Sequence, residues 1–335
     1  MMMEDLFLYT IKSAFVLALL YVPYTLVLSR EKFFRLNRIA LISFMMLSLV
    51  LPLLNVACLS ADNQSVVHVV QQQMIEIGIP VRQAVADYAP AEEEAATVSL
   101  SWFQIVSVVY ILGMAMVLLV RIVQFCRMGM LVRRKCLWKD ASDGITIYCR
   151  AGDVAPFSWF RNIVISEEDY RCNGREIILH EQGHILLCHS YDIVLLTVVQ
   201  MIQWWNPLVY MFGNSLRNVH EYEADDYVLR QGVSLRGYQM LLVKKAIGSS
   251  SYVLANNFNH SLIKNRITMM SEKKTNPWMR CKVLYAIPMV ALSLSVFATP
   301  EFTATFETAV GKAVNNISSY RPAMVLKSDT PAKNL

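Results

Sequence analysis

Two histidines lie four residues apart in the stretch LHEQGHILLCH, and a glutamate directly follows the first of them. Residues four apart on a helix point the same way, so the imidazoles of His180 and His184 can reach one metal ion. Glu181 lies one step around the helix, where its carboxylate can act as a general base on a water molecule. This HExxH arrangement is typical of a zinc peptidase. The alternative is a buried helix whose histidines are satisfied by their neighbours.

A catalytic zinc ion takes three protein ligands and leaves one position open, so the chain has to supply a third ligand. His189 is five residues beyond His184 and is expected to point away from the ligand face of the helix. The stretch NPLVYMFGNSLRNVHEYEADDYVLRQG predicts a second long helix, with Pro207 in its first turn and Gly232 just past its end. We predict that Glu221 on this helix is the third ligand, which gives a gluzincin-like set.

Several other polar residues of the second helix could take part in the site. Asp225 lies one turn after Glu221 and is predicted to support a ligand histidine, with His180 as the expected partner. Glu223 and Asp226 turn toward other faces of the helix and are expected to be surface charges. A solvated acidic face is the competing interpretation of the whole run EYEADD. The group that stabilises the oxyanion stays open among three candidates, which are His220, Tyr222 and Tyr227.

These helices belong to an unusually apolar chain. Hydrophobic residues make up 55% of its 335 residues, which exceeds the usual range of soluble domains. Uncharged or nearly uncharged runs of roughly the length of a bilayer core cover residues 13–28, 39–58 and 102–120, and a shorter run covers 283–298. The seven cysteines are an odd number without a CxxC pair, which argues against a disulfide framework. We therefore expect a multi-pass membrane protein.

The charges of the loops predict the orientation of these runs, because basic residues near the ends of spans stay on the cytoplasmic side. The link SREKFFRLNR carries four basic residues and one acidic residue, whereas residues 59–99 carry six acidic residues and one arginine. The stretch RIVQFCRMGMLVRRKCLWK after the third run carries six basic residues. The amino terminus is therefore expected outside and the HExxH region inside, at a bacterial-type cytoplasmic membrane. The net charge of +5 then needs no nucleic acid to explain it.

The predicted fold class is an α+β membrane protein, with about four transmembrane helices and a mainly helical cytoplasmic zincin-like metallopeptidase domain that contains a small β-sheet. The expected segments are two transmembrane helices with a short basic link (1–58), an extracytoplasmic loop (59–101), a third transmembrane helix (102–120), the cytoplasmic zinc metallopeptidase domain (121–278), a fourth transmembrane helix (279–298) and a flexible extracytoplasmic tail (299–335). The lipid bilayer is thus an expected partner.

The inner region begins with short strands and continues with helices. ITIYCRA alternates between apolar and polar residues as a strand does, APFSWF is expected to turn, and NIVIS is a second short strand. Ser166 followed by three acidic residues predicts a helix start, and Asn173-Gly174 predicts a break before the HExxH helix.

Residues 193–216 contain no charged residue, and hydropathy alone predicts a membrane crossing in this stretch. A single crossing would place His184 and Glu221 on opposite sides of the bilayer, where they could share no metal ion. The break at Asn206-Pro207 instead favours a segment, at about residues 193–212, that dips into the membrane or lies along its interface and then returns.

The order of these features resembles the BlaR/MecR antirepressor family of integral membrane zinc metallopeptidases. The resemblance covers about residues 6 to 298 and includes PFSWFRNIVIS, HEQGH, WWNPLVY, HEYEADDYVL and SLIKNRITMM. The two histidines and Glu181 match the family pattern directly, and Glu221 and Asp225 match its Glu-x-x-x-Asp element.

This resemblance implies a membrane protease of a signal-transduction system, with one Zn²⁺ per chain, that an outer signal switches on. Its substrate would be the protease itself or a DNA-binding transcriptional repressor, and no direct nucleic-acid binding is expected. The family's beta-lactam sensors carry a penicillin-binding domain after the last span; residues 299–335 are too few for one, so beta-lactam sensing is not expected. The alternative function is a non-proteolytic transducer or scaffold with a structural metal site, against which Glu181 argues. The oligomeric state stays open.

Overall fold

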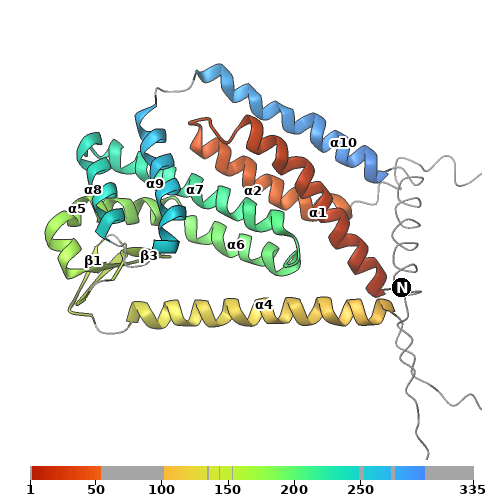
Figure 1. Ribbon diagram of the computed structural model, residues 1–335, viewed down its shortest axis with the longest axis horizontal. Helices are drawn as coiled ribbons and strands as arrows, with labels where there is room; N and C mark the ends of the chain where they lie inside the picture. Colours follow the sequence, from red (N-terminus) through yellow and green to blue (C-terminus); the bar gives the residue numbers. More distant parts are fainter. Residues whose placement is uncertain are drawn as a thin grey trace, which may run out of the picture. The chain divides into compact units, whose positions relative to one another are not determined.

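The chain is mainly helical with one small β-sheet, in a computed structural model that describes residues 2–53, 102–133, 136–142, 144–152, 154–248, 253–272 and 276–298 (Figure 1). This mostly helical α+β composition confirms that part of the predicted fold class. The expected outer loop, 59–101, and the expected tail, 299–335, lie outside the described residues.

Internal contacts divide the chain into two units. One unit comprises Tyr9–Leu54 and Tyr110–Leu294, and it contains the sheet, the HExxH motif and the helices that pack around them. The other comprises Met1–Leu8, Asn55–Val109 and Ser295–Leu335, of which the described residues are the ends of three helices.

Among the residues that the structure describes, three helices have the length and composition needed to cross a membrane. They are α1 (Met2–Val27), α2 (Phe34–Val50, continued by a 3₁₀ turn, η1, Leu51–Leu53) and α4 (Trp102–Arg133). Their apolar stretches, Tyr9–Val27, Phe34–Leu53 and Ile105–Val132, contain 19, 20 and 28 residues, close to or above the ~20 that a bilayer core requires. The third stretch therefore continues well beyond the expected end at residue 120.

The expected fourth span, 279–298, has a different structure. It begins in a 3₁₀ segment, η3 (Pro277–Tyr285), and becomes α-helical only in α10 (Ala286–Ala298), which has 13 residues. A helix of that length is roughly 20 Å long, shorter than a hydrocarbon core of about 30 Å. In the described part of the chain, this helix is thus too short to cross a bilayer without its 3₁₀ extension.

The uncharged stretch after the HExxH motif forms a helical hairpin. Helix α6 (His189–Ile202) leads to a tight turn, and α7 (Pro207–Arg230) returns beside it (Figure 1). Asn206 starts α7, since its side chain accepts a hydrogen bond from the backbone N–H of Leu208, and proline at the first helical position needs no such partner. The stretch is therefore two helices joined by a turn and not one continuous helix.

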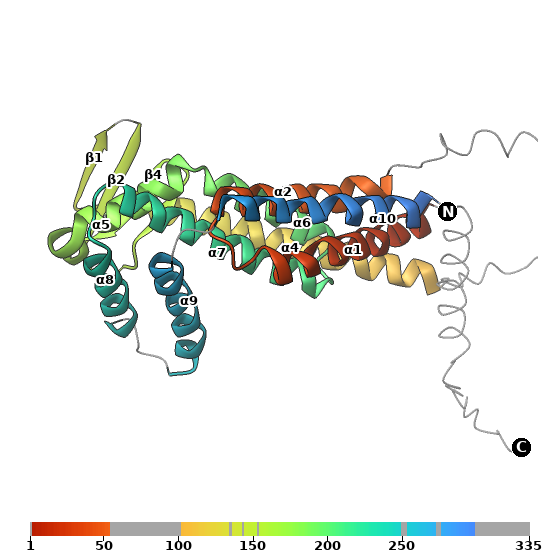
Figure 2. The ribbon, with the colours of Figure 1, turned by 90° about the horizontal axis from the view of Figure 1, so that it is seen from above.

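The hairpin lies lengthwise among the apolar helices, as Figures 1 and 2 both show. At its tip, Gln203 Nε2 donates to Ser13 Oγ of α1 at 2.5 Å, and the Tyr110 hydroxyl of α4 donates to the carbonyl of Ile202 at 2.7 Å. Gln203 is fully buried, so its hydrogen bonds satisfy a polar group that water cannot reach. These contacts fix how deeply the hairpin inserts between the helices.

The close packing of the hairpin depends on Gly213 in α7. A Cβ atom at this position would lie 2.9 Å from Leu196 Cδ2 and 3.1 Å from Gln200 Nε2, both on α6. We expect Gly213→Val to lower the free energy of unfolding by about 1–3 kcal/mol, because overpacking has to push the two helices apart. Chemical denaturation in detergent measures this difference. The matched control is Gly129→Val on α4, where the nearest atom, on Trp159, would be 3.4 Å away; equal losses in both variants would contradict the prediction.

Four strands form the sheet in the order β1-β2-β4-β3. They are β1 (Trp138–Ser142), β2 (Ile145–Arg150), β3 (Phe157–Trp159) and β4 (Asn162–Ser166), and only the β2–β4 pair is parallel. The two predicted strands correspond to β2 and β4. The edge strands were not predicted, because β1 is mostly exposed and polar and β3 is only three residues long.

Strand β4 leads directly into α5 (Glu167–Leu186), the helix with the HExxH motif. The Ser166 hydroxyl accepts a hydrogen bond from the backbone N–H of Asp169 at 3.1 Å, and the acidic first turn favours the helix amino terminus. Asn173 departs from helical geometry, as the Asn-Gly pair predicted. At the other end Cys188 adopts a left-handed conformation (φ 61°), and the chain bends by 56° into α6.

Helices α5 and α7 cross closely near the motif. A Cβ atom at Gly183 would lie 3.3 Å from the backbone of Ala224, so glycine permits this approach. Helices α8 (Leu235–Gly248) and α9 (Val253–Ser271) follow α7; they pack against each other, and α9 also packs against α7 (Figure 2). The core that holds these elements together consists of Ile165, Ile177, Val228, Tyr238 and Leu241.

Candidate metal centre

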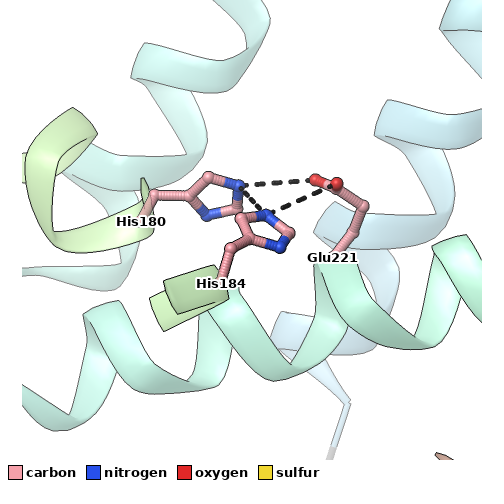
Figure 3. A group of neighbouring side chains, drawn as sticks. All are labelled: His180, His184 and Glu221. Atoms are coloured by element: carbon pink, nitrogen blue, oxygen red, sulfur yellow. Dashed lines mark hydrogen bonds and ion pairs between the residues drawn. The ribbon is translucent and has the colours of Figure 1, made fainter. Parts of the chain in front are cut away.

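Helices α5 and α7 bring three potential metal ligands together. His180 and His184 project from α5 toward Glu221 on α7, as Figure 3 shows. His180 Nε2 lies 3.2 Å from His184 Nε2 and 3.4 Å from Glu221 Oε2, and His184 Nε2 lies 3.6 Å from Glu221 Oε1. Among the described residues, these three form a group whose ligand atoms all lie within 4.8 Å of one another.

The spacing of these atoms suits a tetrahedral divalent ion. Zinc binds histidine nitrogen and carboxylate oxygen at about 2.0–2.1 Å, which makes the edge of a tetrahedron roughly 3.3 Å long. The three measured separations of 3.2, 3.4 and 3.6 Å are close to that edge. Two imidazoles and one carboxylate also form the donor set of a catalytic zinc site that keeps its fourth position open. The residues present therefore fit a metal ion.

The charges at the ligand group favour a cation. Burial disfavours the charged form of His180, but its hydrogen bonds to Asp225 and Glu221 outweigh this effect and raise its pKa to about 9. Burial also raises the pKa of Glu221, but the hydrogen bond to His180 and the charge of Arg266 outweigh it and hold that pKa well below its usual value. The carboxylates thus stabilise positive charge at the position between the histidines.

Glu181, on the same helix as the two ligand histidines, contacts the edge of the sheet. Its side chain is buried, and it accepts a hydrogen bond from Ser158 on strand β3. Burial raises the pKa of the Glu181 carboxyl, and this effect exceeds the opposing effect of the positive charge on His180. A carboxylate with a raised pKa is a better proton acceptor near neutral pH than an exposed one. The sequence did not identify Ser158, because β3 was expected to be a turn.

The far side of His180 is held by a hydrogen-bond network from α7, α8 and α9. Tyr238 lies between His180 Nδ1, at 2.9 Å, and Asp225 Oδ1, to which its hydroxyl donates at 2.7 Å. Asp225 Oδ1 is itself 3.4 Å from His180 Nδ1. Arg266 donates to both oxygens of Asp225, at 2.9 and 2.5 Å. Asp225 thus contacts His180 as predicted from the spacing, and its main hydrogen-bond partners are Tyr238 and Arg266.

Arg266 also reaches the ligand group. Its Nη1 atom lies 2.9 Å from Glu221 Oε2, so one guanidinium links the carboxylate ligand to Asp225. Neither Tyr238 nor Arg266 was predicted as a site residue. Arg266 lies within SLIKNRITMM, a stretch that carries part of the family resemblance. That resemblance was the one feature of the sequence that could have marked Arg266 as a site residue.

The far side of His184 contacts His189 instead of solvent. The two Nδ1 atoms lie 2.8 Å apart, so His189 faces the nitrogen opposite the ligand group, consistent with the expectation that it is not a ligand. It comes this close because the bend at Cys188 starts a new helix. His189 Nε2 in turn lies 3.0 Å from Glu223 Oε2. Glu223 is 5% exposed, so the expectation that it is a surface charge is wrong: α7 packs against both α6 and α2 at this position.

The described contacts of the three oxyanion candidates are with residues other than the three ligands. His220 Nε2 lies 2.9 Å from Asp192 Oδ2, the Tyr222 ring packs against Phe34 with centroids 5.6 Å apart, and Tyr227 lies against Gly183. The Asp226 side chain is 40% exposed and pairs with Arg230 one turn later, as expected for a surface charge.

Comparison with protein families gives one result that bears on the site. A family model described as BlaR1 peptidase M56 matches residues 6–270, which include the three apolar stretches of membrane length, the sheet and all three candidate ligands. A search of curated proteins gives no significant match.

Proposed function

Because the chain belongs to the BlaR1 peptidase M56 family, we propose that it is a zinc-dependent endopeptidase of a membrane signalling system. On an outer signal it would cleave itself, a cytoplasmic transcriptional repressor, or both. The family and the apolar helices indicate a membrane metallopeptidase in signalling. The observation that carries the proposal of catalysis is the position of Glu181 beside the His180, His184 and Glu221 group, since a purely structural metal site needs no general base there.

The residues of the chain divide the chemistry among them. His180, His184 and Glu221 would hold the metal ion, which supplies Lewis acidity toward a peptide carbonyl and a water molecule. Glu181 would take the proton of that water and deliver it to the nitrogen of the leaving amine. The hydrogen bond from Ser158 holds the Glu181 carboxylate in place, and burial excludes competing water. Asp225 and Tyr238 orient His180 so that its Nε2 atom faces His184 and Glu221, the other residues that would hold the ion.

The substrate would bind in an extended conformation along β3. This strand is one edge of the four-stranded sheet, and its Ser158 contacts the proposed general base. An edge strand offers main-chain donors and acceptors that pair with an added strand. A peptide on this edge would pass beside Glu181, and main-chain pairing would make its recognition largely independent of side-chain identity.

We place the protein in a bacterial-type cytoplasmic membrane with its amino terminus outside and its metal centre at the inner face. The carboxyl end of α1, the amino end of α2 and the carboxyl end of α4 carry the basic loops, and the sheet and the HExxH helix follow the carboxyl end of α4 along the chain. In this arrangement the α6–α7 hairpin is re-entrant: it enters from the inner face and returns to it, which keeps His184 and Glu221 on the same side. The buried backbone of its turn is tolerated because neighbouring helices satisfy its polar groups.

Single cysteines on the two arms of the hairpin test this topology. Tyr191 and Arg217 are both exposed, and both lie near the inner end of the hairpin. In a background without native cysteines, we expect Tyr191→Cys and Arg217→Cys to react with a membrane-impermeant maleimide only from the cytoplasmic side. Trp205→Cys at the tip is the control and should resist labelling from that side. Labelling of the two arms from opposite sides would show a single crossing and would remove the shared metal site.

Metal removal tests the proposed chemistry. We expect purified protein to contain one zinc ion per chain, and we expect a chelator to stop self-cleavage or repressor cleavage in membranes. Restoring zinc should restore cleavage, whereas magnesium should not, because a histidine-rich donor set disfavours a hard cation. Cleavage that continues at the same rate after complete metal removal would rule out a metallopeptidase mechanism.

A further inference from the structure

A chain of buried hydrogen bonds connects the ligand histidine His184 to the apolar helix α2. His184 Nδ1 lies 2.8 Å from His189 Nδ1, and His189 Nε2 lies 3.0 Å from Glu223 Oε2. Arg38 of α2 donates from Nη1 to the same Glu223 oxygen at 3.3 Å. His189 and Glu223 are 3% and 5% exposed, so these bonds lie out of reach of water. We call Arg38, Glu223 and His189 the relay.

The donors and acceptors of the relay follow from the ligand group. When His184 Nε2 faces a metal ion, the ring keeps its single proton on Nδ1, and that N–H can donate to His189 Nδ1. His189 then carries its own proton on Nε2 and donates it to Glu223. Every member thus has one consistent role, and the sequence of donors runs from the metal ligand toward the carboxylate. A carboxylate at the end of such a chain raises the basicity of the ligand and fixes the orientation of its ring.

Arg38 joins both helices of the hairpin to α2. In addition to Glu223 of α7, its Nε atom donates to Asp192 Oδ2 of α6 at 2.6 Å. Asp192 also pairs with His220, whose ring stacks on His189 with centroids 4.1 Å apart and an angle of 11°. Figures 1 and 2 show α2 beside α6 and α7 along this contact. A shift of α2 would therefore pull on both arms of the hairpin at the level of the metal centre.

The two ligand histidines are supported from different parts of the fold. His180 is held through Tyr238 and Asp225 by Arg266, which belongs to α9. His184 is held through the relay by an arginine of an apolar helix that the proposed topology places in the membrane. Each network ends in an arginine that pairs with a buried carboxylate. Among the described contacts, however, only the relay behind His184 connects a proposed metal ligand to a candidate membrane span.

We propose that Arg38, Glu223 and His189 are positioning residues for His184, and that the placement of α2 thereby sets the affinity of the site for zinc. The proposal rests on the proposed function, because it assigns regulation to the same metal centre. Without Arg38, Glu223 Oε2 keeps its contact with His189 but loses the guanidinium that ties the carboxylate to α2. The carboxylate is then held less firmly, so the relay orients His184 less well.

The test measures the zinc affinity of the full chain in lipid nanodiscs, by competition with a chromophoric chelator. We expect Arg38→Met and His189→Phe each to weaken zinc binding by about 10- to 100-fold, the usual effect of losing an outer hydrogen-bond partner. Arg121→Met is the matched control. Arg121 also lies on an apolar helix and donates to Gln200 of α6 at 3.0 Å, but it is outside the relay, so its loss should change zinc affinity by no more than about fivefold.

A further variant separates positioning from a general loss of structure. Arg38→Lys keeps a positive charge beside Glu223 and should recover most of the affinity that Arg38→Met loses, with unfolding midpoints measured for all variants. Wild-type affinity in both Arg38→Met and His189→Phe would overturn the relay while leaving the proposed function intact. An equal loss in Arg121→Met, or no recovery in Arg38→Lys, would likewise overturn it. Wild-type protein that binds no zinc would overturn the proposed function, and the relay with it.

Discussion

Replacing Glu181 by glutamine is expected to abolish cleavage while leaving the metal site filled. The amide keeps the size of the side chain and can still contact Ser158, but it cannot accept a proton from water. Because general base catalysis contributes typically 10²–10⁴-fold, we expect the rate of self-cleavage or repressor cleavage to fall by about that factor. Quantitative immunoblotting of the products in membranes measures the rate, and elemental analysis of the purified variant measures its zinc content.

The control for this variant is Glu168→Gln on the same helix. Glu168 is exposed in the first turn of α5, far along the helix from the motif, and its replacement should change neither zinc content nor cleavage. The experiment also separates the two candidate functions. If Glu181→Gln cleaves as fast as the wild type, or if the wild type cleaves nothing under inducing conditions, the protein is better described as a transducer or scaffold with a structural metal ion. The protein that accumulates in the Glu181→Gln strain would identify the substrate.

Loss of the carboxylate ligand is expected to empty the metal site. In Glu221→Ala, two imidazoles remain, and Arg266 loses the partner that lies 2.9 Å from its Nη1 atom. The guanidinium keeps its pairing with Asp225, but no carboxylate then lies between it and the histidines, so a cation there meets more repulsion in addition to having one ligand fewer. We expect zinc affinity to fall by more than the roughly 100-fold that follows loss of an outer partner. Competition with a chelator, as for the relay variants, measures this change.

The matched control for Glu221→Ala is Asp226→Ala, which removes a carboxylate from the same helix. Asp226 pairs with Arg230 at the surface, so this variant should retain stoichiometric zinc and wild-type cleavage. Retention of one tightly bound zinc ion in Glu221→Ala would show that the third ligand is another residue. Parallel loss of zinc in both variants would indicate that the helix itself is disturbed.

The two variants fail in different ways, and this difference is informative. Glu181→Gln should separate metal binding from catalysis, whereas Glu221→Ala should remove both together. If both Glu181→Gln and Glu221→Ala lose zinc, Glu181 is needed for zinc binding as well as for catalysis. If neither variant loses zinc, the metal ion binds at another site. The expected pattern is specific to a site in which three residues bind the ion and a fourth handles the proton.

The sequence alone was sufficient for the parts of this protein that depend on local geometry. Spacing by four residues on a helix places His180 and His184 on one face, and the same periodicity places Asp225 one turn beyond Glu221. The apolar runs predicted three helices of membrane length, and the order of motifs identified the family that the comparison confirms. The helix start at Ser166 and the break at Asn173 followed from side chains that act on their own backbone.

Only the tertiary structure decided which distant residues complete the site. Tyr238 and Arg266 reach His180 and Glu221 from 58 and 45 positions further along the chain, and Arg38 reaches Glu223 from 185 positions away. No periodicity links such residues, because their proximity results from the packing of α2, α8 and α9 against α7. The hairpin was likewise ambiguous, since an uncharged run of 24 residues, 193–216, suits a single span and a re-entrant pair equally well. The tip of the hairpin contacts Ser13 and Tyr110, and Glu223 is buried against a helix from the other end of the sequence. Both features result from tertiary packing, which a pattern along the sequence does not reveal.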